Sequence, residues 1–212
     1  NPYFRCREVM EFMQERGVNV VVPPGGLRYA DLPIILPEIK GMVQNHTGRI
    51  VLDVGGDPVG ARVLSSLAGS FDPDEMDVFI VLNANRPFTD TVEGCVQMMQ
   101  DIETAARLSI TALVGNTHLM EDTSWDVILQ GHRLVTDVSE RTGLPIRFVT
   151  ADATLLDGQD GAPDLPSPVL RLHRHMLPPW IDARWRGARR LRMGGGRWAG
   201  PMQTRKPRQR VG

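Results

Sequence analysis

The sequence is poor in cysteine and has no long hydrophobic run. Its two cysteines, Cys6 and Cys95, lie far apart in predicted helices and match neither a metal-ligand spacing nor a disulfide framework. No apolar stretch approaches the roughly 18–20 residues that a helix needs to cross a bilayer. These features exclude a disulfide-stabilised scaffold and a transmembrane helix, and they favour small buried thiols in a reducing cytoplasm.

Lysine is also scarce, and no glycine-rich turn ends in Gly-Lys-Thr or Gly-Lys-Ser. Lys40 and Lys206 are the only lysines. In P-loop nucleoside triphosphatases such a turn and its lysine hold the β- and γ-phosphates. We therefore do not expect this chain alone to hydrolyse ATP. The first residue is Asn1 rather than Met, which favours a chain that begins inside a longer protein.

Charge is distributed unevenly along the chain, although the formal net charge is only −1. Residues 181–212 hold ten of the 24 basic residues and, in Asp182, one of the 25 acidic residues. We therefore predict an α/β domain over residues 1–160, an extended segment over 161–180 and a disordered basic tail over 181–212. Such a tail can neutralise nucleic-acid or membrane phosphates. Alternatively, it has no selected function, as a solvated tail or the product of an altered reading frame.

Short apolar runs alternate with amphipathic stretches through most of the chain. The content of apolar residues, 42%, suffices for a buried core. Strands that alternate with helices pair in parallel through right-handed crossovers, so we predict an α/β fold with a mainly parallel sheet and flanking helices. The predicted strands cover residues 18–22, 50–54, 77–83, 110–114 and 146–149, the last of these being the final strand. The predicted helices cover residues 4–16, 38–45, 59–68, 89–108 (with Thr89 as N-cap) and 124–142.

The stretch RIVLDVGGDPVGA, residues 49–61, is predicted to form a buried strand, a glycine turn and the start of a helix. Ligands of open α/β sheets bind at the carboxyl ends of the strands, where Asp53 would lie. Gly55 and Gly56 permit a sharp turn and a close approach to a phosphate. Alternatively, Asp53 and Asp57 are turn and cap residues of a tight strand-to-helix connection. A degenerate dinucleotide-binding turn is a further alternative, with the spacing GGxxxG in place of GxGxxG.

Polar residues also follow two later predicted strands and are candidate cofactor-binding residues. Asn116 follows the strand 110–114, and its amide can donate and accept at the same time, as an adenine edge requires. It is alternatively a turn or cap residue. Asn83 and Arg86 lie at the end of the strand 77–83, where Arg86 can meet a phosphate or be solvated. The five histidines form no ligand cluster in the sequence.

Several motifs together resemble those of the MinD/ParA-type P-loop ATPases, in particular the CobQ/CobB/MinD/ParA nucleotide-binding proteins described as cobyrinic acid a,c-diamide synthase-like. The resemblance covers about residues 1–180. It implies a three-layer, P-loop NTPase-like fold whose N-terminal strand and phosphate loop are missing here. The motifs are Asn1-Pro2-Tyr3-Phe4-Arg5, Asp53-Val54-Gly55-Gly56-Asp57, the stretch 83–87, Asn116-Thr117-His118-Leu119 and Leu177-Pro178-Pro179-Trp180.

The resemblance also implies cofactors and residue roles. The cofactors are ATP and Mg²⁺. The residue that matches Asp53 orients the water shell of the magnesium ion, and Asp57 is a second candidate, because a small hard cation prefers carboxylate and water oxygens. The glycines that match Gly55 and Gly56 lie in the switch that senses the γ-phosphate. The residue that matches Asn116 contacts the base.

These features predict the C-terminal part of a MinD/ParA-like ATP-binding protein, which when intact would be a magnesium-nucleotide switch ATPase. The alternative is a non-catalytic α/β binding or interaction module that has lost the phosphate loop. An amidotransferase-type synthetase that acts on a corrin precursor follows from the family description alone. A sheet without its first strand and helix exposes apolar surface, so we expect a homodimer or a partner protein. Residues 181–212 are the candidate contact with nucleic acid.

Overall fold

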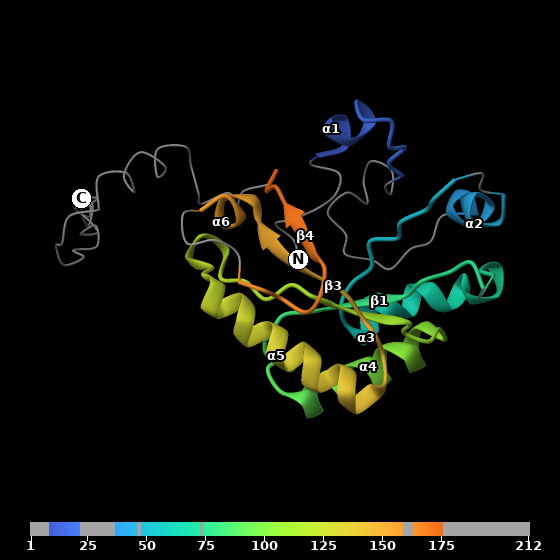
Figure 1. Cartoon of the computed structure of the whole chain (residues 1–212). Coiled ribbons are helices and arrows are strands. Elements are labelled where there is room, and N and C mark those ends of the chain that lie inside the picture. The colour runs from blue at the N-terminus through green and yellow to red at the C-terminus, as the bar shows by residue number, and fades with distance from the viewer. Residues whose placement is uncertain (1–8, 22–36, 46–47, 73, 159–162, 176–212) are drawn as a thin grey trace, which may run out of the picture.

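A computed structural model describes residues 9–21, 37–45, 48–72, 74–158 and 163–175. Its centre is a four-stranded, all-parallel sheet with the strand order β1-β2-β3-β4 (Figure 1). The predicted α/β fold with a parallel sheet and flanking helices is confirmed. Because consecutive strands are neighbours and parallel, each connection crosses over the sheet and carries a helix.

The strands and helices of the second half of the chain follow the predicted alternation closely. The predicted strands 77–83, 110–114 and 146–149 correspond to the first three strands of the sheet. The strands are β1 (Phe79–Leu82), β2 (Ala112–Gly115), β3 (Ile146–Asp152) and β4 (Val169–Leu172). The helices are α1 (Met10–Gln14), α2 (Pro37–Gln44), α3 (Pro58–Ala61), α4 (Val92–Ala106), α5 (Trp125–Thr142) and α6 (Ala153–Leu156). The 3-10 turns are Arg62–Ser66, Ala68–Ser70 and Met120–Asp122, so the predicted helix 59–68 is α3 continued by 3-10 turns.

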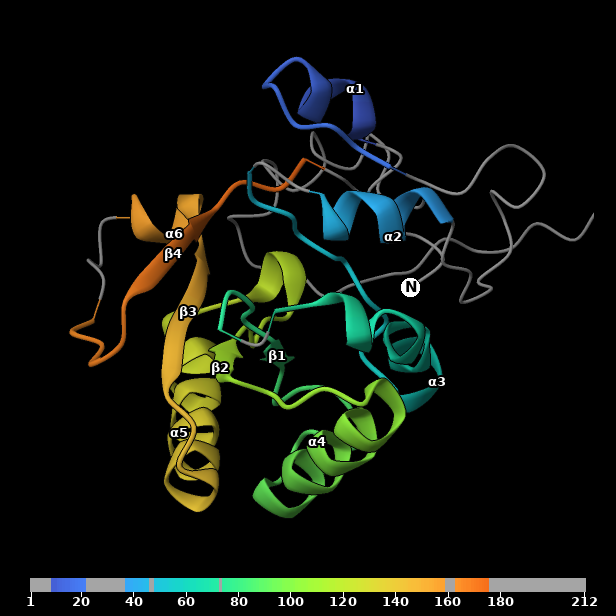
Figure 2. The same ribbon diagram turned by 90° about the vertical axis from the view of Figure 1, so that its right-hand side faces the viewer.

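The core lies between the sheet and the two long helices. Helices α4 and α5 lie together on one side of the molecule, and α1 and α2 lie on the opposite side (Figures 1 and 2). Burying one large apolar side chain in such a core contributes about 1.5–3 kcal/mol relative to leaving it exposed. Cys95 is fully buried in this core, as predicted for a small helical thiol. The buried cluster comprises Ile80, Leu82, Cys95, Met99, Ile110, Leu113, Val135 and Val138.

Helix α4 begins later than predicted. The hydroxyl of Thr89, the predicted N-cap, donates instead to the backbone carbonyl of Asn83 at 3.0 Å. Thr91 is the N-cap, and its Oγ1 accepts a hydrogen bond from the backbone N–H of Gly94 at 3.1 Å. Thr89 therefore belongs to the turn that leaves β1, and this turn places Asn83 at the edge of the sheet.

Helix α5 has the ends that its sequence predicts. Ser124 is the N-cap and accepts from the backbone N–H of Val127 at 3.4 Å. Gly143 ends the helix in the left-handed region, with φ 74°, which glycine adopts without steric cost. Between these ends, α5 packs against β2 and β3. Its position fixes what lies beneath the ends of those two strands.

Two predicted strands are absent from the described part of the chain. Residues 18–21 and 50–54 form no strand. Val18 is 45% exposed and Val51 is 91% exposed, so the expectation that these segments are buried is also wrong. An apolar, β-type sequence forms a strand only where a neighbouring backbone completes the hydrogen-bond ladder. No described strand pairs with either segment.

The outer edge of β1 has no neighbour among the described strands. Successive side chains of a strand point to opposite faces. Ile80 and Leu82 face the core, whereas Phe79 is 40% exposed and Val81 is 58% exposed. On this outward face the rings of Phe79 and Phe148 meet edge to face, with centroids 6.3 Å apart. The sheet therefore has an exposed apolar margin at β1, as expected of a sheet that lacks a neighbouring strand.

The predicted extended segment 161–180 contributes a strand to the same sheet. β4 pairs in parallel with β3, from Val149 opposite Val169 to Asp152 opposite Leu172. The prediction that the strand 146–149 is the last one is therefore wrong. All four residues of β4 are exposed, so this edge strand lacks the alternation of buried and exposed residues that predicts a strand. Arg171 anchors it through two hydrogen bonds to the carboxylate of Asp157, at 2.8 and 2.9 Å.

Several predictions fall outside the described residues. These are the first part of the helix 4–16, the motif at residues 1–5, Cys6, the end of the strand 18–22, the ending 177–180 and the basic tail 181–212. The described part of the first helix is α1, which begins at Met10. Among the described residues, no helix is long and apolar enough to cross a membrane.

Candidate functional site

The carboxyl ends of all four strands meet at one edge of the sheet, because the strands are parallel. A polar residue stands at or just after each end: Asn83, Asn116, Asp152 and His173. Ligands of open parallel sheets bind outside this edge. We therefore take the carboxyl edge as the candidate site. It includes three of the residues that the sequence predicted, Asn83, Asn116 and Arg86.

Asn116 is held by both neighbouring strands. Its backbone N–H donates to the carbonyl of Leu82, the last residue of β1, at 2.8 Å. Its side-chain Oδ1 accepts a hydrogen bond from Oγ1 of Thr150 in β3 at 2.6 Å. Thr150 is only 8% exposed, whereas Asn116 is half-buried. The amide oxygen of Asn116 is therefore held by Thr150, in a residue that is only half-buried.

Thr117 ties the same turn to β1 and rests on α5. Its Oγ1 accepts from the backbone N–H of Ala84 at 3.0 Å, and the residue is 6% exposed. Gly131 of α5 lies directly against it, since a Cβ atom at Gly131 would lie 2.1 Å from Oγ1 of Thr117. Only a glycine allows the helix and the turn to approach this closely. The floor under the strand ends is therefore closely packed.

Asn83 shapes the turn after β1. Its Oδ1 accepts from the backbone N–H of Asn85 at 2.9 Å. Its carbonyl accepts from the backbone N–H of Arg86 at 3.1 Å and from the hydroxyl of Thr89. Asn83 is 9% exposed, so its structure is that of an Asn-based turn. Arg86 follows on the exposed side of this turn.

His118 lies among positive charges at the edge. Its Nδ1 accepts a hydrogen bond from the backbone N–H of Met120 at 3.3 Å. Burial lowers its pKa, and the charges of Arg86 and Arg174 lower it further. The lowered pKa favours the neutral form of His118. The two guanidinium groups reach the same part of the edge from the turn after β1 and the segment after β4.

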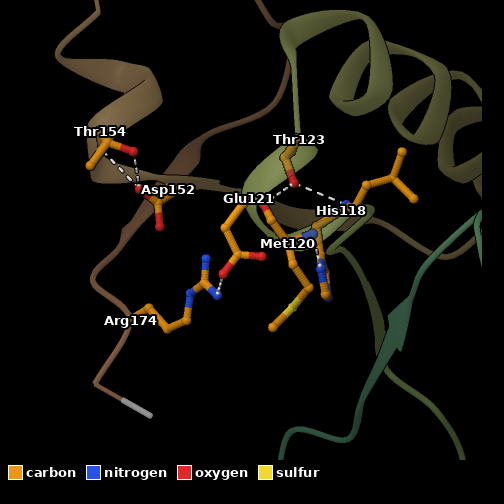
Figure 3. A network of polar contacts seen from close by, with 8 residues as sticks. His118, Met120, Glu121, Thr123, Asp152, Thr154 and Arg174 are labelled. Carbon is orange, nitrogen blue, oxygen red and sulfur yellow. Dashed lines mark hydrogen bonds and ion pairs between the residues drawn. The ribbon is translucent and has the colours of Figure 1, made fainter. Parts of the chain in front are cut away.

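An ion pair closes the edge on the β4 side. Nη1 of Arg174 lies 2.7 Å from Oε1 of Glu121, with the side chains 28% and 29% exposed. Figure 3 shows these two side chains pointing toward each other beside Asp152. Oδ1 of Asp152 accepts from both the backbone N–H and the hydroxyl of Thr154, and the hydroxyl bond is the main cause of its lowered pKa. The pair joins the segment after β4 to the turn after β2.

The predicted metal residues have a different setting. Asp53 is exposed in an irregular segment, and no hydrogen bond or ion pair joins it to the strand ends within the described residues. Asp57 is the N-cap of α3, and its Oδ1 accepts from the backbone N–H of Gly60 at 2.8 Å. The cap that the sequence offered as an alternative for Asp57 is therefore present. No group of three potential metal ligands occurs among the described residues.

Of the two predicted switch glycines, one is required by close packing. A Cβ atom at Gly55 would lie 3.0 Å from Cα of Gly60, and one at Gly60 would lie 2.8 Å from Cα of Gly55. A Cβ atom at Gly56 would meet nothing within 4 Å. Neither Gly55 nor Gly56 has a positive φ. The glycine turn thus lets the chain fold back against the start of α3.

A hollow of the described surface lies elsewhere. It has a volume of about 580 Å³ and is lined by residues that include Arg62, Asp101, Thr104 and Arg107. Asp101 and Thr104 belong to α4, and Arg107 directly follows its last residue. Helix α4 runs back from the carboxyl edge to the opposite edge of the sheet. The hollow lacks the convergence of strand ends that defines the carboxyl edge. We therefore place the candidate site at the strand ends.

Sequence reasoning missed Thr150 and Gly131. Thr150 is an ordinary strand residue in the sequence, and no local signal links it to Asn116, 34 positions earlier. Gly131 did carry a signal, because an isolated glycine within a long amphipathic helix costs about 1 kcal/mol relative to alanine and calls for a packing reason.

The fold and the strand-end site define an all-parallel α/β protein with an amide-bearing carboxyl edge. No family model, curated protein or solved structure matches the chain. Any function must therefore be argued from the residues at that edge.

Proposed function

We propose that the carboxyl edge binds a purine nucleotide through Asn116. The observation that carries this proposal is the anchoring of Asn116, whose backbone bonds to Leu82 and whose Oδ1 bonds to Thr150. An asparagine amide can donate to N7 and accept from N6 of adenine. A side chain that is already ordered loses little further entropy when it binds. The nucleotide in this proposal is ATP, as in the MinD/ParA-like proteins that the sequence resembles.

The charges at the edge support a ligand that carries phosphate. Arg86 and Arg174 both act on His118, so two guanidinium groups flank the turn that carries Asn116. Guanidinium groups bind phosphate oxygens in bidentate fashion. In this proposal Arg86, which is exposed, provides the first contact with the phosphates. Arg174 keeps its bond to Glu121.

The magnesium half of the proposal assigns Asp53 to the metal-bound water shell, Asp57 to a secondary role there and Gly55 and Gly56 to a switch. Asp53 is exposed, and its carboxylate is a ligand that Mg²⁺ prefers. The grip on the phosphates has to come from a lysine-bearing loop outside this sequence. We therefore propose hydrolysis only for a protein in which such a loop is supplied, in a cytoplasmic setting.

Titration of the nitrogen-15-labelled chain with adenosine tests the base half. We expect weak binding that shifts the side-chain NH₂ signals of Asn116 and the backbone signals of residues 83–86. Asn116→Ala should weaken adenosine binding roughly three- to tenfold, the worth of one net hydrogen bond. Asn45→Ala, which removes an exposed asparagine at the end of α2, should leave it unchanged. Equal affinity in both variants, or no shift at the strand ends, contradicts the proposal.

A separate experiment tests the metal half. In a protein that carries the phosphate loop, we expect Asp53→Ala to abolish ATP hydrolysis and to leave the fold intact, because the side chain is exposed. Hydrolysis is followed by phosphate release, and folding by circular dichroism. Unchanged turnover would remove Asp53 from the magnesium shell. The coding sequence upstream of Asn1 offers a direct check, since a Gly-Lys-Thr or Gly-Lys-Ser turn there supports the ATPase.

The open edge of β1 favours a second candidate, an interaction module without catalysis. Phe79 and Val81 expose an apolar face beside an edge that carries no described neighbour. Such an edge pairs with a further strand from a partner or from a second copy. Val81→Lys should then reduce self-association in sedimentation experiments without unfolding the chain. A contact of residues 181–212 with nucleic acid stays a prediction, because those residues lie outside the described part of the chain.

A further inference from the structure

We infer that Thr150 fixes the amide of Asn116 so that its Nδ2 group donates to N7 of a purine base. This inference rests on the proposed function and concerns the same site. Thr150 would thus be a positioning residue for base recognition, on a different strand from the residue that touches the base.

The direction of the hydrogen bond sets the orientation of the amide. Oγ1 of Thr150 donates to Oδ1 of Asn116 at 2.6 Å. Thr150 is 8% exposed, so its hydroxyl is removed from most solvent and depends on this bond. A flipped amide would turn Nδ2 toward Oγ1 and leave the buried hydroxyl hydrogen without this acceptor, which costs about 1–3 kcal/mol. The bond therefore favours one of the two amide orientations.

In that orientation Nδ2 takes no part in the bond to Thr150. Among the described residues, no group accepts a hydrogen bond from Nδ2 of Asn116. The ligand atom that meets Nδ2 must therefore be an acceptor. N7 is an acceptor in both adenine and guanine. Oδ1 keeps one lone pair beside the bond to Thr150, so it can also accept from N6 of adenine.

The backbone on either side prevents the turn from adjusting. The N–H of Asn116 is bonded to Leu82, and the next residue, Thr117, is bonded to Ala84 and packed on Gly131. The amide can therefore move only by rotation of its own side chain. The Thr150 hydroxyl is the group that restrains this rotation.

Adenosine and 7-deazaadenosine, which has a C–H group in place of N7, are the probes. For the labelled wild-type chain we expect adenosine to bind roughly three- to tenfold more tightly than 7-deazaadenosine. In Thr150→Val, which keeps the shape and removes the hydroxyl, this preference should fall to less than about twofold. Thr150→Ser, which keeps the hydroxyl, should retain the preference.

A second readout does not depend on the ligand. Nitrogen-15 relaxation of the Asn116 NH₂ group should show a more mobile amide in both Thr150→Val and Thr150→Ala than in Thr150→Ser. Circular dichroism confirms that each variant is folded, and the alanine variant replaces the valine variant if the latter is not. A purely structural role would lower stability without changing the ratio of the two affinities.

The outcomes separate the two ideas. If wild type binds adenosine at the strand ends and Thr150→Val keeps the full preference over 7-deazaadenosine, the role of Thr150 is overturned while the proposed function stands. If wild type binds adenosine but shows no preference, the contact with N7 is wrong. If adenosine does not shift the strand-end signals at all, the proposed function fails, and this inference fails with it.

Discussion

Replacing Gly131 by alanine perturbs the floor of the candidate site directly. The added Cβ atom would lie 2.1 Å from Oγ1, 2.2 Å from Cβ and 2.8 Å from Cγ2 of Thr117. Carbon atoms pack at about 3.5–4.0 Å, so the helix and the turn must separate by roughly 1 Å or more. Thr117 cannot simply rotate away, because its Cβ takes part in the clash and its Oγ1 is bonded to Ala84.

The expected cost follows from two opposing terms. Overpacking a filled core costs about 1–3 kcal/mol, and the upper end applies because the clash involves Cβ rather than a flexible side-chain end. Alanine gains about 1 kcal/mol over glycine inside a helix. We therefore expect Gly131→Ala to lower the free energy of unfolding by about 2 kcal/mol. Urea denaturation followed by far-ultraviolet circular dichroism measures it.

A second helical glycine is the matched control. A Cβ atom at Gly41 in α2 would meet nothing within 4 Å. Gly41→Ala should therefore leave the chain as stable as wild type, or more stable by up to about 1 kcal/mol. If Gly131→Ala behaves like Gly41→Ala, the close approach of α5 to the strand ends is refuted.

Three further predictions concern a cap, a pair of histidines and a thiol. Asp57→Ala should destabilise the start of α3 by about 1 kcal/mol and Asp57→Ser by less, because serine still caps; equal urea midpoints would show that the cap contributes nothing. Burial lowers the pKa of His118 and His132 in the folded chain. As the pH drops, the unfolded chain therefore takes up protons before the folded chain does. The stability that these histidines contribute should be complete above about pH 6.5 and should fall below that pH. Thermal melting across that range measures this loss, and a midpoint that does not change contradicts it. Burial and the charge of Asp90 raise the pKa of Cys95 to about 11, so its thiol should react with a disulfide reagent only slowly at neutral pH until urea unfolds the chain; rapid reaction in the folded Cys6→Ser variant contradicts this.

The alternation of strands and helices from β1 to β3 was predictable because it depends on local periodicity. Helix α5 has a serine cap, an amphipathic stripe and a terminal glycine within one stretch of sequence. The strand predictions fail where the presence or absence of a neighbouring strand decides whether a segment forms a strand. Residues 50–54 have the composition of a strand, yet they form none, because no described strand pairs with them, and Val51 is 91% exposed. β4 was missed for the opposite reason, since pairing with β3 makes a strand of exposed residues.

The candidate site could be predicted only in part. The position of Asn116 after a strand identified it as a residue of the carboxyl edge, and Asn83 was found by the same rule. Thr150 could not be found, because its contact with Asn116 spans 34 positions and depends on the pairing of β2 with β3. The interpretation of Asp57 as a helix cap was correct, because an Asp-Pro pair favours the start of a helix wherever that helix lies in the fold.

The most direct measurement of the proposed function is the location of adenosine on the labelled chain by intermolecular nuclear Overhauser effects. We predict contacts between H8 of adenosine, which neighbours N7, and the side-chain NH₂ of Asn116. Contacts confined to the hollow lined by Arg62 and Arg107, or the absence of any contact at the strand ends, would contradict purine binding at the carboxyl edge.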